Sequence, residues 1–330
     1  MNWQAVIAGT GHYTPEGVLT NADLERMVNT SDEWIVTRTG IRERRIRRNG
    51  EATSDFIVSA ARNALDQAGK TPDEIEAIIV GTVTPDYRVP STASIVQRGL
   101  NAPKAAILDI AAACAGFIYG LAMAKAFVET GMYQTILVAG AEALTSITNY
   151  QDRNTCVLFG DGCGCAVISR ADNGEEKKGI LSAHLSGDGR LSELLHIPVG
   201  GSKVPLTPQN FAERRHYLIM DGREVFKHAV REMADSCQRA LSKAGLTVHD
   251  IDMVIPHQAN IRIIDALVKK LNVNREKVYI NIERYGNTSS ASVPIALDEA
   301  RRAGLITEGM TVLMTAFGGG LTWGAAVVRF

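Results

Sequence analysis

The feature that most constrains this chain is an internal duplication. Two stretches lie 176 positions apart and share a helical pattern, an Ala-Gly stop, an acidic turn and a hydrophobic strand pattern. The paired positions are Ala64 with Ala240, Leu65 with Leu241, Ala68 with Ala244, Gly69 with Gly245, Thr71 with Thr247 and Ile75 with Ile251. The same order of strand, turn, helix, glycine-containing turn and strand follows each stretch. The sequence therefore predicts an α/β protein of two homologous halves, with parallel sheets covered by helices.

The boundary between the halves is placed at a polar break, residues 171–178, which read ADNGEEKK. The predicted domains are residues 1–173 and residues 174–330. A chain of 330 residues is long enough for two domains with a core each. In α/β folds, sites lie beyond the carboxyl ends of the strands, so the turns after the strands are the places to search.

Hydrophobic periodicity and the Gly, Pro and Asn positions give the individual elements. The predicted strands are residues 3–8, 75–80, 107–110, 134–140, 165–169, 179–185, 252–256, 278–282, 311–316 and 325–330. The predicted helices are residues 21–28 with Asn21 as N-cap, 54–68, 92–100, 114–129, 221–244, 260–270 and 289–303. Residues 30–48 are mostly polar and rich in arginine, which predicts either a solvated surface or an anion-binding rim.

Composition excludes several classes of protein. A net charge of −1 gives no general attraction to nucleic acid or to an anionic membrane. The five cysteines, an odd number, do not form the framework of a secreted disulfide protein. The apolar run at residues 110–124 is shorter than the ~20 residues that span a bilayer. No basic segment precedes an apolar core at the N-terminus, so we expect no signal peptide and a cytoplasmic protein.

Cys114 lies in the middle of the segment Ile107–Glu129, ILDIAAACAGFIYGLAMAKAFVE. The segment predicts a buried strand, a turn of small residues and a buried helix that begins at Cys114. The free N–H groups and positive dipole of a helix N-terminus favour a thiolate, which predicts a pKa below the usual ~8.5. The alternative is a buried, unreactive cysteine that fills a small gap. This segment alone leaves both interpretations open.

Three further sites follow predicted strands in the second half: His257, Asn287 and Gly318–Gly320. Together with Cys114 they allow two chemistries. In a cysteine hydrolase, His257 is the base and Asn287 orients it. In carbon–carbon bond formation, Cys114 accepts an acyl group while His257 and Asn287 donate hydrogen bonds to the oxygen of a second thioester. A carboxamide is a good donor and a poor base, which favours the second chemistry, although a strand-end histidine and a turn asparagine are also common structural features.

Six motifs together carry a resemblance that covers nearly the whole chain. They are TSDEWIVTRTGIRERR at residues 30–45, AAACAGF at 111–117, FGDG at 159–162, PHQANIRII at 256–264, GNTSSASVP at 286–294 and FGGGLTWG at 317–324. As a set they resemble the β-ketoacyl-acyl-carrier-protein synthase III family, which initiates bacterial type II fatty-acid synthesis. The resemblance implies a duplicated, thiolase-like fold, layered αβαβα, with mostly parallel mixed sheets.

The resemblance also implies a reaction and the residues that perform it. The reaction is a decarboxylative Claisen condensation of an acyl-CoA with malonyl-acyl-carrier protein, by a multifunctional acyltransferase. Cys114 is then the acyl-accepting nucleophile, and His257 and Asn287 polarise the malonyl thioester. The amides of Cys114 and Gly319 form the oxyanion hole, and Phe317 lies beside the site. The alternatives are a condensing enzyme of secondary metabolism with the same fold and a cysteine thioesterase.

The substrate sites are likewise implied by the resemblance. Trp34, Arg38 and Arg153 match residues that hold the adenine end of coenzyme A, and Thr30 and Asn260 match residues of the pantetheine tunnel. A basic patch that docks the acyl-carrier protein corresponds to Lys227, Arg262, Lys269 and Lys270. The loop Thr84–Ser91 matches one that crosses a homodimer interface, where Val89 lines the acyl pocket of the partner. No cofactor is expected, because the coenzyme A thioester is a substrate.

Two departures from the family pattern bear on metal binding and specificity. Cys163 and Cys165 stand where alanine is usual, and with Cys156 they form a Cys-x6-Cys-x-Cys pattern. We expect no metal site there, on the argument that the two strand cysteines point to opposite faces. The loop Gly200–Arg215 is longer than in compact relatives, which leaves the length of the acyl primer open.

Overall fold

A computed structural model of the chain describes residues 3–172 and 178–330. The predicted domain boundary at residues 173 and 174 lies outside the described residues. The strands are β1 (Trp3–Tyr13), β2 (Gly17–Thr20), β3 (Glu43–Ile46), β4 (Ala77–Gly81), β5 (Ala106–Ile110), β6 (Thr135–Ala143), β7 (Asp161–Asp172), β8 (Gly179–Gly187), β9 (Leu195–His196), β10 (Ile219–Met220), β11 (Met253–Pro256), β12 (Thr311–Gly318) and β13 (Thr322–Arg329). The α-helices are α1 (Asn21–Glu25), α2 (Asp32–Thr39), α3 (Thr53–Ala68), α4 (Thr92–Leu100), α5 (Gly116–Glu129), α6 (Arg153–Cys156), α7 (Pro208–Ala212), α8 (Gly222–Ala244), α9 (Ile261–Leu271), α10 (Ile282–Tyr285) and α11 (Ser292–Arg302).

Two mixed sheets form the centre of the molecule. One has the strand order β1-β7-β6-β4-β5 and the other has the order β11-β12-β13-β8. Strand β4 pairs in parallel with β5 and with β6, and β11 pairs in parallel with β12. The other neighbours in these two sheets are antiparallel, because β7 and β13 return alongside the strands that precede them. The sheets are therefore mixed, as expected. The expectation that parallel pairs predominate in them is not met.

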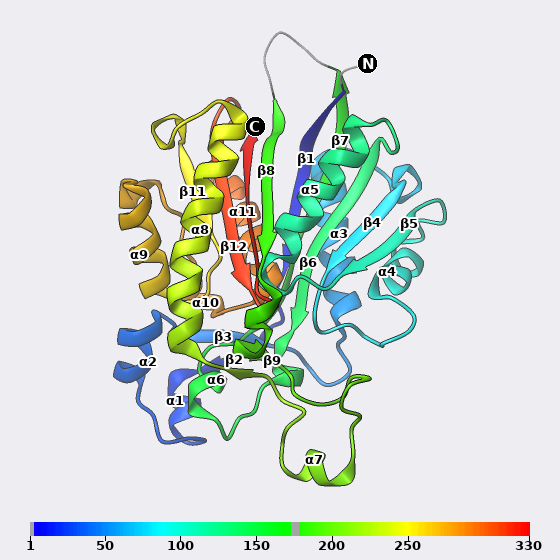
Figure 1. The fold of residues 1–330 in the computed structure, drawn as a ribbon. Helices are drawn as coiled ribbons and strands as arrows, with labels where there is room; N and C mark the ends of the chain where they lie inside the picture. The colour runs from blue at the N-terminus through cyan, green and yellow to red at the C-terminus, as the bar shows by residue number, and fades with distance from the viewer. Residues whose placement is uncertain (1–2, 173–177) are drawn as a thin grey trace.

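Helices and sheets alternate in five layers. Helices α5 and α11 lie between the two sheets and contact strands of both (Figure 1). Helices α3 and α4 cover the outer face of the first sheet, and α8 and α9 cover the outer face of the second. Three large apolar clusters fill the spaces between these layers, and the central cluster joins residues of both sheets. The predicted αβαβα architecture is confirmed.

The duplication extends to backbone conformation. The 3₁₀ turn η2 (Ala113–Ala115) and the 3₁₀ turn η7 (Ser289–Ala291) are separated by the same 176 positions as the sequence repeat. Ala113 and Ser289, the first residues of these turns, have φ angles of +44° and +50°. Such angles are unusual for residues other than glycine and cluster at functional sites. The two turns pack against each other, and each leads directly into a central helix, α5 or α11.

Several predicted elements have different boundaries or another structure. The strand predicted at residues 278–282 is absent: Val278 forms only an isolated bridge to Val254, and Ile282 begins α10. The side chain of Thr20, not Asn21, caps α1. Residues 32–39 form α2 within the stretch predicted to be polar surface. The region 200–215 contains the short helix α7, which projects at the lower edge of Figure 1.

Arg44 shows that the arginine-rich segment is not simply a solvated rim. Its side chain is fully buried, and burial lowers its pKa to about 10. The guanidinium donates hydrogen bonds to the carbonyl of Leu19, to Oδ1 of Asn21 and to the carbonyl of Val157. Arg44 therefore supports the chain at Val157, whose side chain contributes to the wall of the main cavity.

The sequence predicted that strand β5 is buried. The strand lies instead at an edge of the first sheet. Ile107 is 39% exposed in the single chain. The prediction was wrong because an apolar, β-branched strand pattern does not reveal whether a strand lies inside a sheet or at its edge. No helix in the described parts of the chain is both long enough and apolar enough to cross a membrane.

Close approach between the two halves predicts one stability effect. A Cβ atom at Gly140 in β6 would lie 2.2 Å from the carbonyl oxygen of Ser290 in η7. Gly140→Ala must separate the two segments, and we expect it to lower the free energy of unfolding by at least about 1–3 kcal/mol. Urea unfolding measures this change. The control is Gly189→Ala, where no atom lies within 4 Å of the added carbon; equal stability of the two variants would contradict the prediction.

Candidate active site

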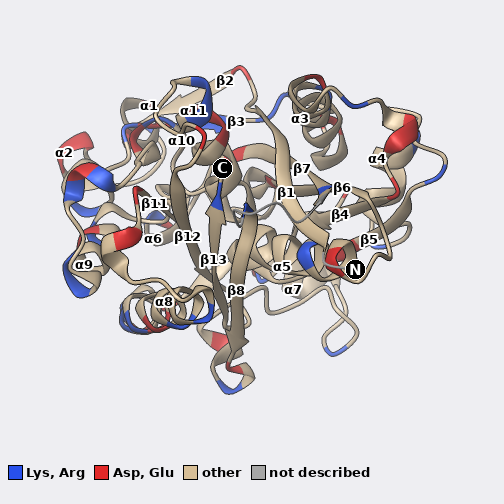
Figure 2. Cartoon of the chain, turned by 90° about the horizontal axis from the view of Figure 1, so that it is seen from above, with Lys and Arg blue, Asp and Glu red and all other residues tan. Residues whose placement is uncertain are grey.

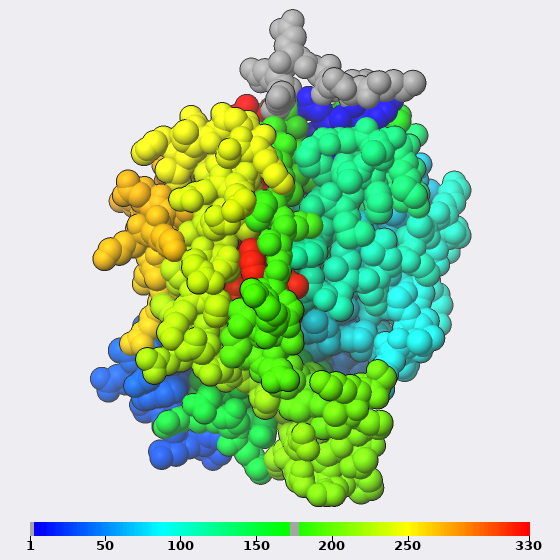
Figure 3. Space-filling model, viewed as in Figure 1, coloured from blue at the N-terminus to red at the C-terminus, as the bar shows by residue number. Residues whose placement is uncertain are grey.

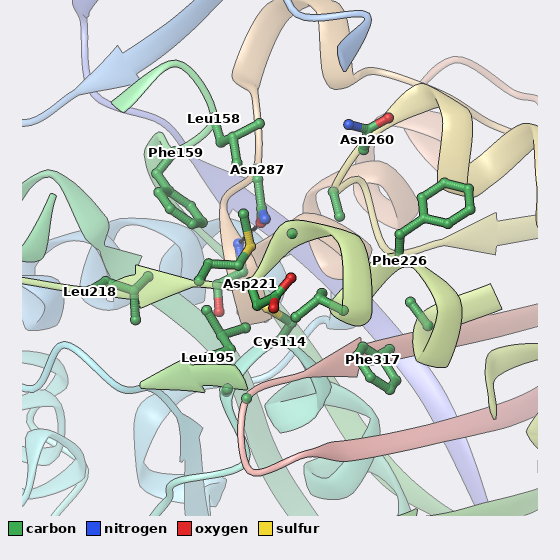
Figure 4. A pocket seen from close by; sticks show the side chains of 18 of the residues that line it. Cys114, Leu158, Phe159, Leu195, Leu218, Asp221, Phe226, Asn260, Asn287 and Phe317 are labelled. Carbon is green, nitrogen blue, oxygen red and sulfur yellow. Dashed lines mark hydrogen bonds between the residues drawn. The ribbon is translucent and has the colours of Figure 1, made fainter. Parts of the chain in front are cut away.

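A cavity of about 1350 Å³ lies between the two halves and contains most of the predicted site residues. Its wall includes Cys114, His257 and Asn287. Figure 4 shows Cys114, Asn287 and Phe317 around this space, each supplied by a different segment of the chain. In the space-filling view, red residues near the C-terminus are visible between green residues that follow β8 and yellow-green residues of α8 (Figure 3). The structure thus brings together Cys114 and Asn287, which are 173 positions apart in the sequence.

Cys114 lies in the turn η2, before α5, and not in the first turn of the helix as predicted. Its side chain is only 7% exposed, and that exposed part lies in the cavity. The glycine segment after β12 packs closely on this turn, because a Cβ atom at Gly318 would lie 2.5 Å from the amide nitrogen of Cys114. Only glycine allows this approach. Gly319, the predicted oxyanion residue, lines the cavity beside it, and Phe317 is buried and stacked on Trp323.

His257 follows β11 and is held by two hydrogen bonds. Its backbone N–H donates to the carbonyl of Thr315, and its Nδ1 lies 2.6 Å from Oγ of Ser292. The same Ser292 oxygen accepts the N–H of Gln258 at 3.3 Å. The Ser292 hydroxyl hydrogen can therefore be donated to Nδ1, which leaves the imidazole hydrogen on Nε2. Burial lowers the pKa of His257 to about 3, so the ring is neutral and can act as a hydrogen-bond donor at neutral pH.

Asn287 is fixed by its own turn and not by His257. Its Oδ1 accepts the backbone N–H of Ser289 at 2.8 Å, and its backbone N–H donates to the carbonyl of Leu158. Because the amide oxygen is already occupied, the NH₂ group is the part of the side chain available to a ligand in the cavity. The hydrolase interpretation required Asn287 to orient His257. Ser292 occupies that position instead, which favours two independent hydrogen-bond donors.

The predicted low pKa of Cys114 is wrong for the free protein. Burial raises the pKa of the thiol to about 12, and the nearby carboxylate of Glu142 contributes in the same direction. A hydrogen-bonding interaction with the Ser289 hydroxyl lowers it, but by less. The helix N-terminus alone does not determine the charge of this cysteine, because the site excludes water and contains an acidic side chain.

Glu142 is the principal residue that the sequence analysis missed. It lies in β6, is fully buried, and burial raises its pKa to about 7. Its signal was a single carboxylate within the apolar strand pattern TILVAGAEAL at residues 135–144. A buried carboxyl group with a strongly shifted pKa often marks a functional site.

Comparison with known proteins gives the family. The model for the C-terminal region of 3-oxoacyl-[acyl-carrier-protein] synthase III matches residues 241–330, and a second model for the same synthase matches residues 108–189. A β-ketoacyl-[acyl-carrier-protein] synthase III from Caldanaerobacter subterraneus subsp. tengcongensis is 54% identical over 326 residues, which are 99% of this chain and 98% of that protein. The chain belongs to the synthase III family.

Solved structures of the same fold agree. The synthase III of Aquifex aeolicus is 48% identical, with a TM-score of 0.91 over 99% of this chain and 100% of that one. A priming β-ketosynthase from a polyketide biosynthetic pathway is 35% identical, with a TM-score of 0.91 over 100% of this chain and 97% of that one. The family and the thiolase-like fold implied by the sequence motifs are therefore confirmed.

Of the five residues predicted for coenzyme A binding in this synthase III chain, Trp34, Arg38 and Asn260 line the cavity. The guanidinium groups of Arg38 and Arg153 each lie 4.7 Å from the centre of the Trp34 ring. Arg153 lines a second, smaller hollow next to it. Thr30 does not line the main cavity; its Oγ1 is buried and has no hydrogen-bond partner among the described residues. An arginine–tryptophan stack of this kind is a suitable surface for an adenine ring.

The predicted docking residues lie on two neighbouring helices. Lys269 and Lys270 are exposed in the last turn of α9, and Arg262 lies in its first turn, at the cavity wall. Lys227 on α8 is exposed but forms an ion pair with Glu224. Figure 2 shows blue residues on α2, α8 and α9 on the same side of the molecule. Val89 is 87% exposed and does not contribute to the cavity of this single chain.

Cys163 and Cys165 correct one argument made from the sequence. Their sulfur atoms lie 3.6 Å apart, because alternate residues of a strand share a face and do not point to opposite faces. Both side chains lie in the apolar cluster between the first sheet and α3. Burial raises the pKa of Cys163 well above its usual value, which keeps this thiol protonated.

Burial of His257 predicts a specific dependence of stability on pH. The unfolded histidine has a pKa of 6.5 and the folded one a pKa of about 3, so folding releases a proton between these values. Stability is therefore lost as pH falls from 6.5 towards 3, by up to about 1.4 kcal/mol per pH unit. Glu142, whose pKa is raised to about 7, acts in the opposite direction between pH 7 and 4.5.

The variant His257→Gln isolates the contribution of the histidine. We expect urea unfolding at a series of pH values to show a weaker loss of stability in acid for the variant than for the wild type. Parallel curves for the two proteins between pH 6.5 and 4 would show that His257 is not held neutral by burial.

Proposed function

We propose that this protein catalyses the decarboxylative condensation of an acyl-CoA primer with malonyl-acyl-carrier protein, which initiates type II fatty-acid synthesis. One observation carries the proposal: a buried cysteine shares a cavity with two neutral hydrogen-bond donors, His257 and Asn287. The identity of 54% to a β-ketoacyl-[acyl-carrier-protein] synthase III over nearly the whole chain supports the same assignment.

In the first step Cys114 attacks the thioester carbonyl of the acyl-CoA. A bond forms between Sγ and the acyl carbon, the bond from that carbon to the coenzyme A sulfur breaks, and the acyl group remains on Cys114. We assign the backbone N–H groups of Cys114 and Gly319 to the stabilisation of the oxyanion of the tetrahedral intermediate. The glycines of this segment permit the close contact with the turn η2.

In the second step the malonyl thioester loses carbon dioxide and becomes an enolate. Nε2–H of His257 and the NH₂ group of Asn287 donate hydrogen bonds to its oxygen, where negative charge develops. Because the imidazole is neutral, it is a donor of a hydrogen bond and a poor acid. The enolate is then not quenched by protonation, and its carbon attacks the acyl group on Cys114. Side chains and backbone N–H groups of this chain supply the chemistry, so we propose that no cofactor takes part.

The cavity has a volume of about 1350 Å³ and includes both Cys114 and Trp34 in its wall, so we assign one thioester substrate to the whole of it. The stack of Trp34 with Arg38 and Arg153 suits the adenine of coenzyme A. Apolar residues of β9, β10 and α8 also line the cavity. Asn260, which lines the cavity, is assigned to the pantetheine arm; for Thr30, which lies outside the cavity wall, the same assignment rests on the family resemblance alone.

We further propose a cytoplasmic homodimer. Strand β5 offers an unpaired sheet edge with Ile107 partly exposed, and the loop before α4 exposes Tyr87 at 60% and Val89 at 87%. Isolated exposed apolar side chains are common, but an apolar strand edge beside an apolar loop is a surface that natural proteins usually cover. A second copy that continues the sheet would cover both and would place Val89 at the acyl pocket of its partner.

Two variants test the assigned roles. Cys114→Ala is expected to abolish both loading of an acyl group, observed by mass spectrometry of the protein, and condensation. Asn287→Ala is expected to load acyl groups but to lose at least about tenfold in malonyl decarboxylation, since one donor to the enolate is missing. The control is Cys237→Ala, a buried cysteine outside the cavity. Free fatty acid in place of a new carbon–carbon bond would identify a thioesterase.

Charge reversal tests the carrier-protein surface. In the variant Lys269→Glu with Lys270→Glu, we expect KM for malonyl-acyl-carrier protein to rise at least about fivefold, because an acidic partner is repelled. KM for malonyl-CoA should change little. Arg62→Glu, on the exposed face of α3 in the other half, is the control. An equal effect on both malonyl donors would show that these lysines do not bind the carrier protein.

A further inference from the structure

Glu142 is a buried acid that the mechanism above does not use. Its carboxyl group accepts hydrogen bonds from residues of both halves of the molecule. On one side the donors are the hydroxyl groups of Thr82 and Thr84 and the N–H of Val83, at 2.6–3.3 Å. On the other side the hydroxyl groups of Ser289 and Ser290 lie 3.1 and 3.2 Å away. Among the described residues no Lys, Arg or His forms an ion pair with this carboxylate.

Ser289 connects Glu142 to the nucleophile. Its hydroxyl donates to Oε1 of Glu142 at 3.1 Å, and Ser289 and Cys114 line the same cavity from two turns that pack against each other. The Ser289 hydroxyl also lowers the pKa of the Cys114 thiol, as a nearby hydrogen-bonding group does. A hydroxyl has one hydrogen to donate, so while Ser289 donates to Glu142 it can accept the S–H of Cys114. If Glu142 gains a proton, the Ser289 hydroxyl is free to donate to a thiolate. The turn that holds Ser289 in this position has the unusual φ angle of +50°.

We propose that Glu142 stores the proton of Cys114 during catalysis, with Ser289 as the group through which the proton passes. The inference rests on the proposed function for the acyl substrate, but the proton transfer itself is a property of the free protein. Cys114, Ser289 and Glu142 come from η2, η7 and β6, and only the packing of the two halves brings them together.

The charge of the site supports this assignment. If Cys114 lost its proton to solvent, a second negative charge would form in a buried space beside the Glu142 carboxylate, which is unfavourable. Transfer from the thiol to the carboxylate leaves one negative charge in the same space. Among the described residues, the side chains that hydrogen-bond to Glu142 are the hydroxyl groups of Thr82, Thr84, Ser289 and Ser290, which are not ionised at neutral pH. His257, which shares the cavity with Cys114, is kept neutral by burial.

Every proton that is released in the reaction is accounted for. The S–H bond of Cys114 breaks, Ser289 passes on its own hydrogen as it receives that of the thiol, and an O–H bond forms on Glu142. Sγ then bonds to the acyl carbon, and the coenzyme A sulfur leaves with its electron pair and takes a proton from solvent. When the enolate later displaces Sγ from the acyl group, Glu142 returns its proton through Ser289. The net uptake of one proton is the one now on coenzyme A.

The rate at which iodoacetamide alkylates Cys114 measures formation of the thiolate without any substrate. We expect Glu142→Gln to react at least about tenfold more slowly than wild type at pH 7, with the pH midpoint shifted upward. Simple electrostatics predicts the reverse, because removal of a nearby negative charge favours a thiolate. Faster alkylation of Glu142→Gln would therefore overturn the inference.

Three further variants keep the test decisive if Glu142→Gln folds poorly. Ser289→Ala leaves the carboxylate in place but interrupts the path, so it should also slow alkylation, and its combination with Glu142→Gln should be no slower than either alone. Glu142→Asp should restore part of the rate with a pH profile similar to that of wild type. Ser290→Ala should keep the wild-type midpoint, because the Ser290 hydroxyl lies 3.2 Å from the same carboxyl group but donates its hydrogen to the carbonyl of Gly81 at 2.7 Å. Unchanged alkylation of Ser289→Ala would overturn the inference.

Condensation assays on the same proteins separate this inference from the proposed function. If wild-type protein alkylates as expected but forms no β-ketoacyl product, the proposed function fails and the proton transfer stands. If condensation occurs while Glu142→Gln and Ser289→Ala alkylate like wild type, the proposed function stands and the role of Glu142 fails.

Discussion

The contact between the turns η2 and η7 is the constraint on which the rest of this structure depends. Each turn leads into a central helix, the two turns pack against each other, and glycines at β4 and β6 let the first sheet approach both of them closely. A Cβ atom at Gly81 would lie 2.7 Å from the carbonyl carbon of Gly116, and one at Gly140 would lie 2.2 Å from the carbonyl oxygen of Ser290. This contact sets the position of Cys114 relative to Asn287, because each residue lies within two positions of one of the turns. The cavity and its chemistry follow from that position.

The active site is buried from solvent and contains few ionised side chains. Burial keeps His257 neutral and opposes ionisation of Cys114, and the carboxyl group of Glu142 is surrounded by hydroxyl and N–H donors. Neutral donors suit a reaction whose intermediate is an enolate, since they stabilise its charge and do not protonate its carbon. The thiol then needs an acceptor for its proton, and the one buried acid that interacts with it is the natural candidate.

Much of the fold could be predicted from the sequence because its signals are local. The Ala-Gly stops at Gly69 and Gly245, the apolar strand patterns and the spacing of 176 positions each specify an element or its repetition. Errors arose where local pattern does not decide structure. Residues 278–282 are apolar enough for a strand but have no second strand partner, and β5 has the pattern of an internal strand although it lies at an edge.

The sequence by itself determined the α/β class, the duplication, the family and the residue types that the chemistry requires. These properties depend on motifs and periodicities that are visible in the amino-acid sequence without a structure. Only the tertiary structure decided the protonation states of Cys114 and His257 and the contact between Ser289 and Glu142. The pKa of a side chain depends on its burial and on charges from segments distant in the chain, and neither can be read from its neighbours in sequence.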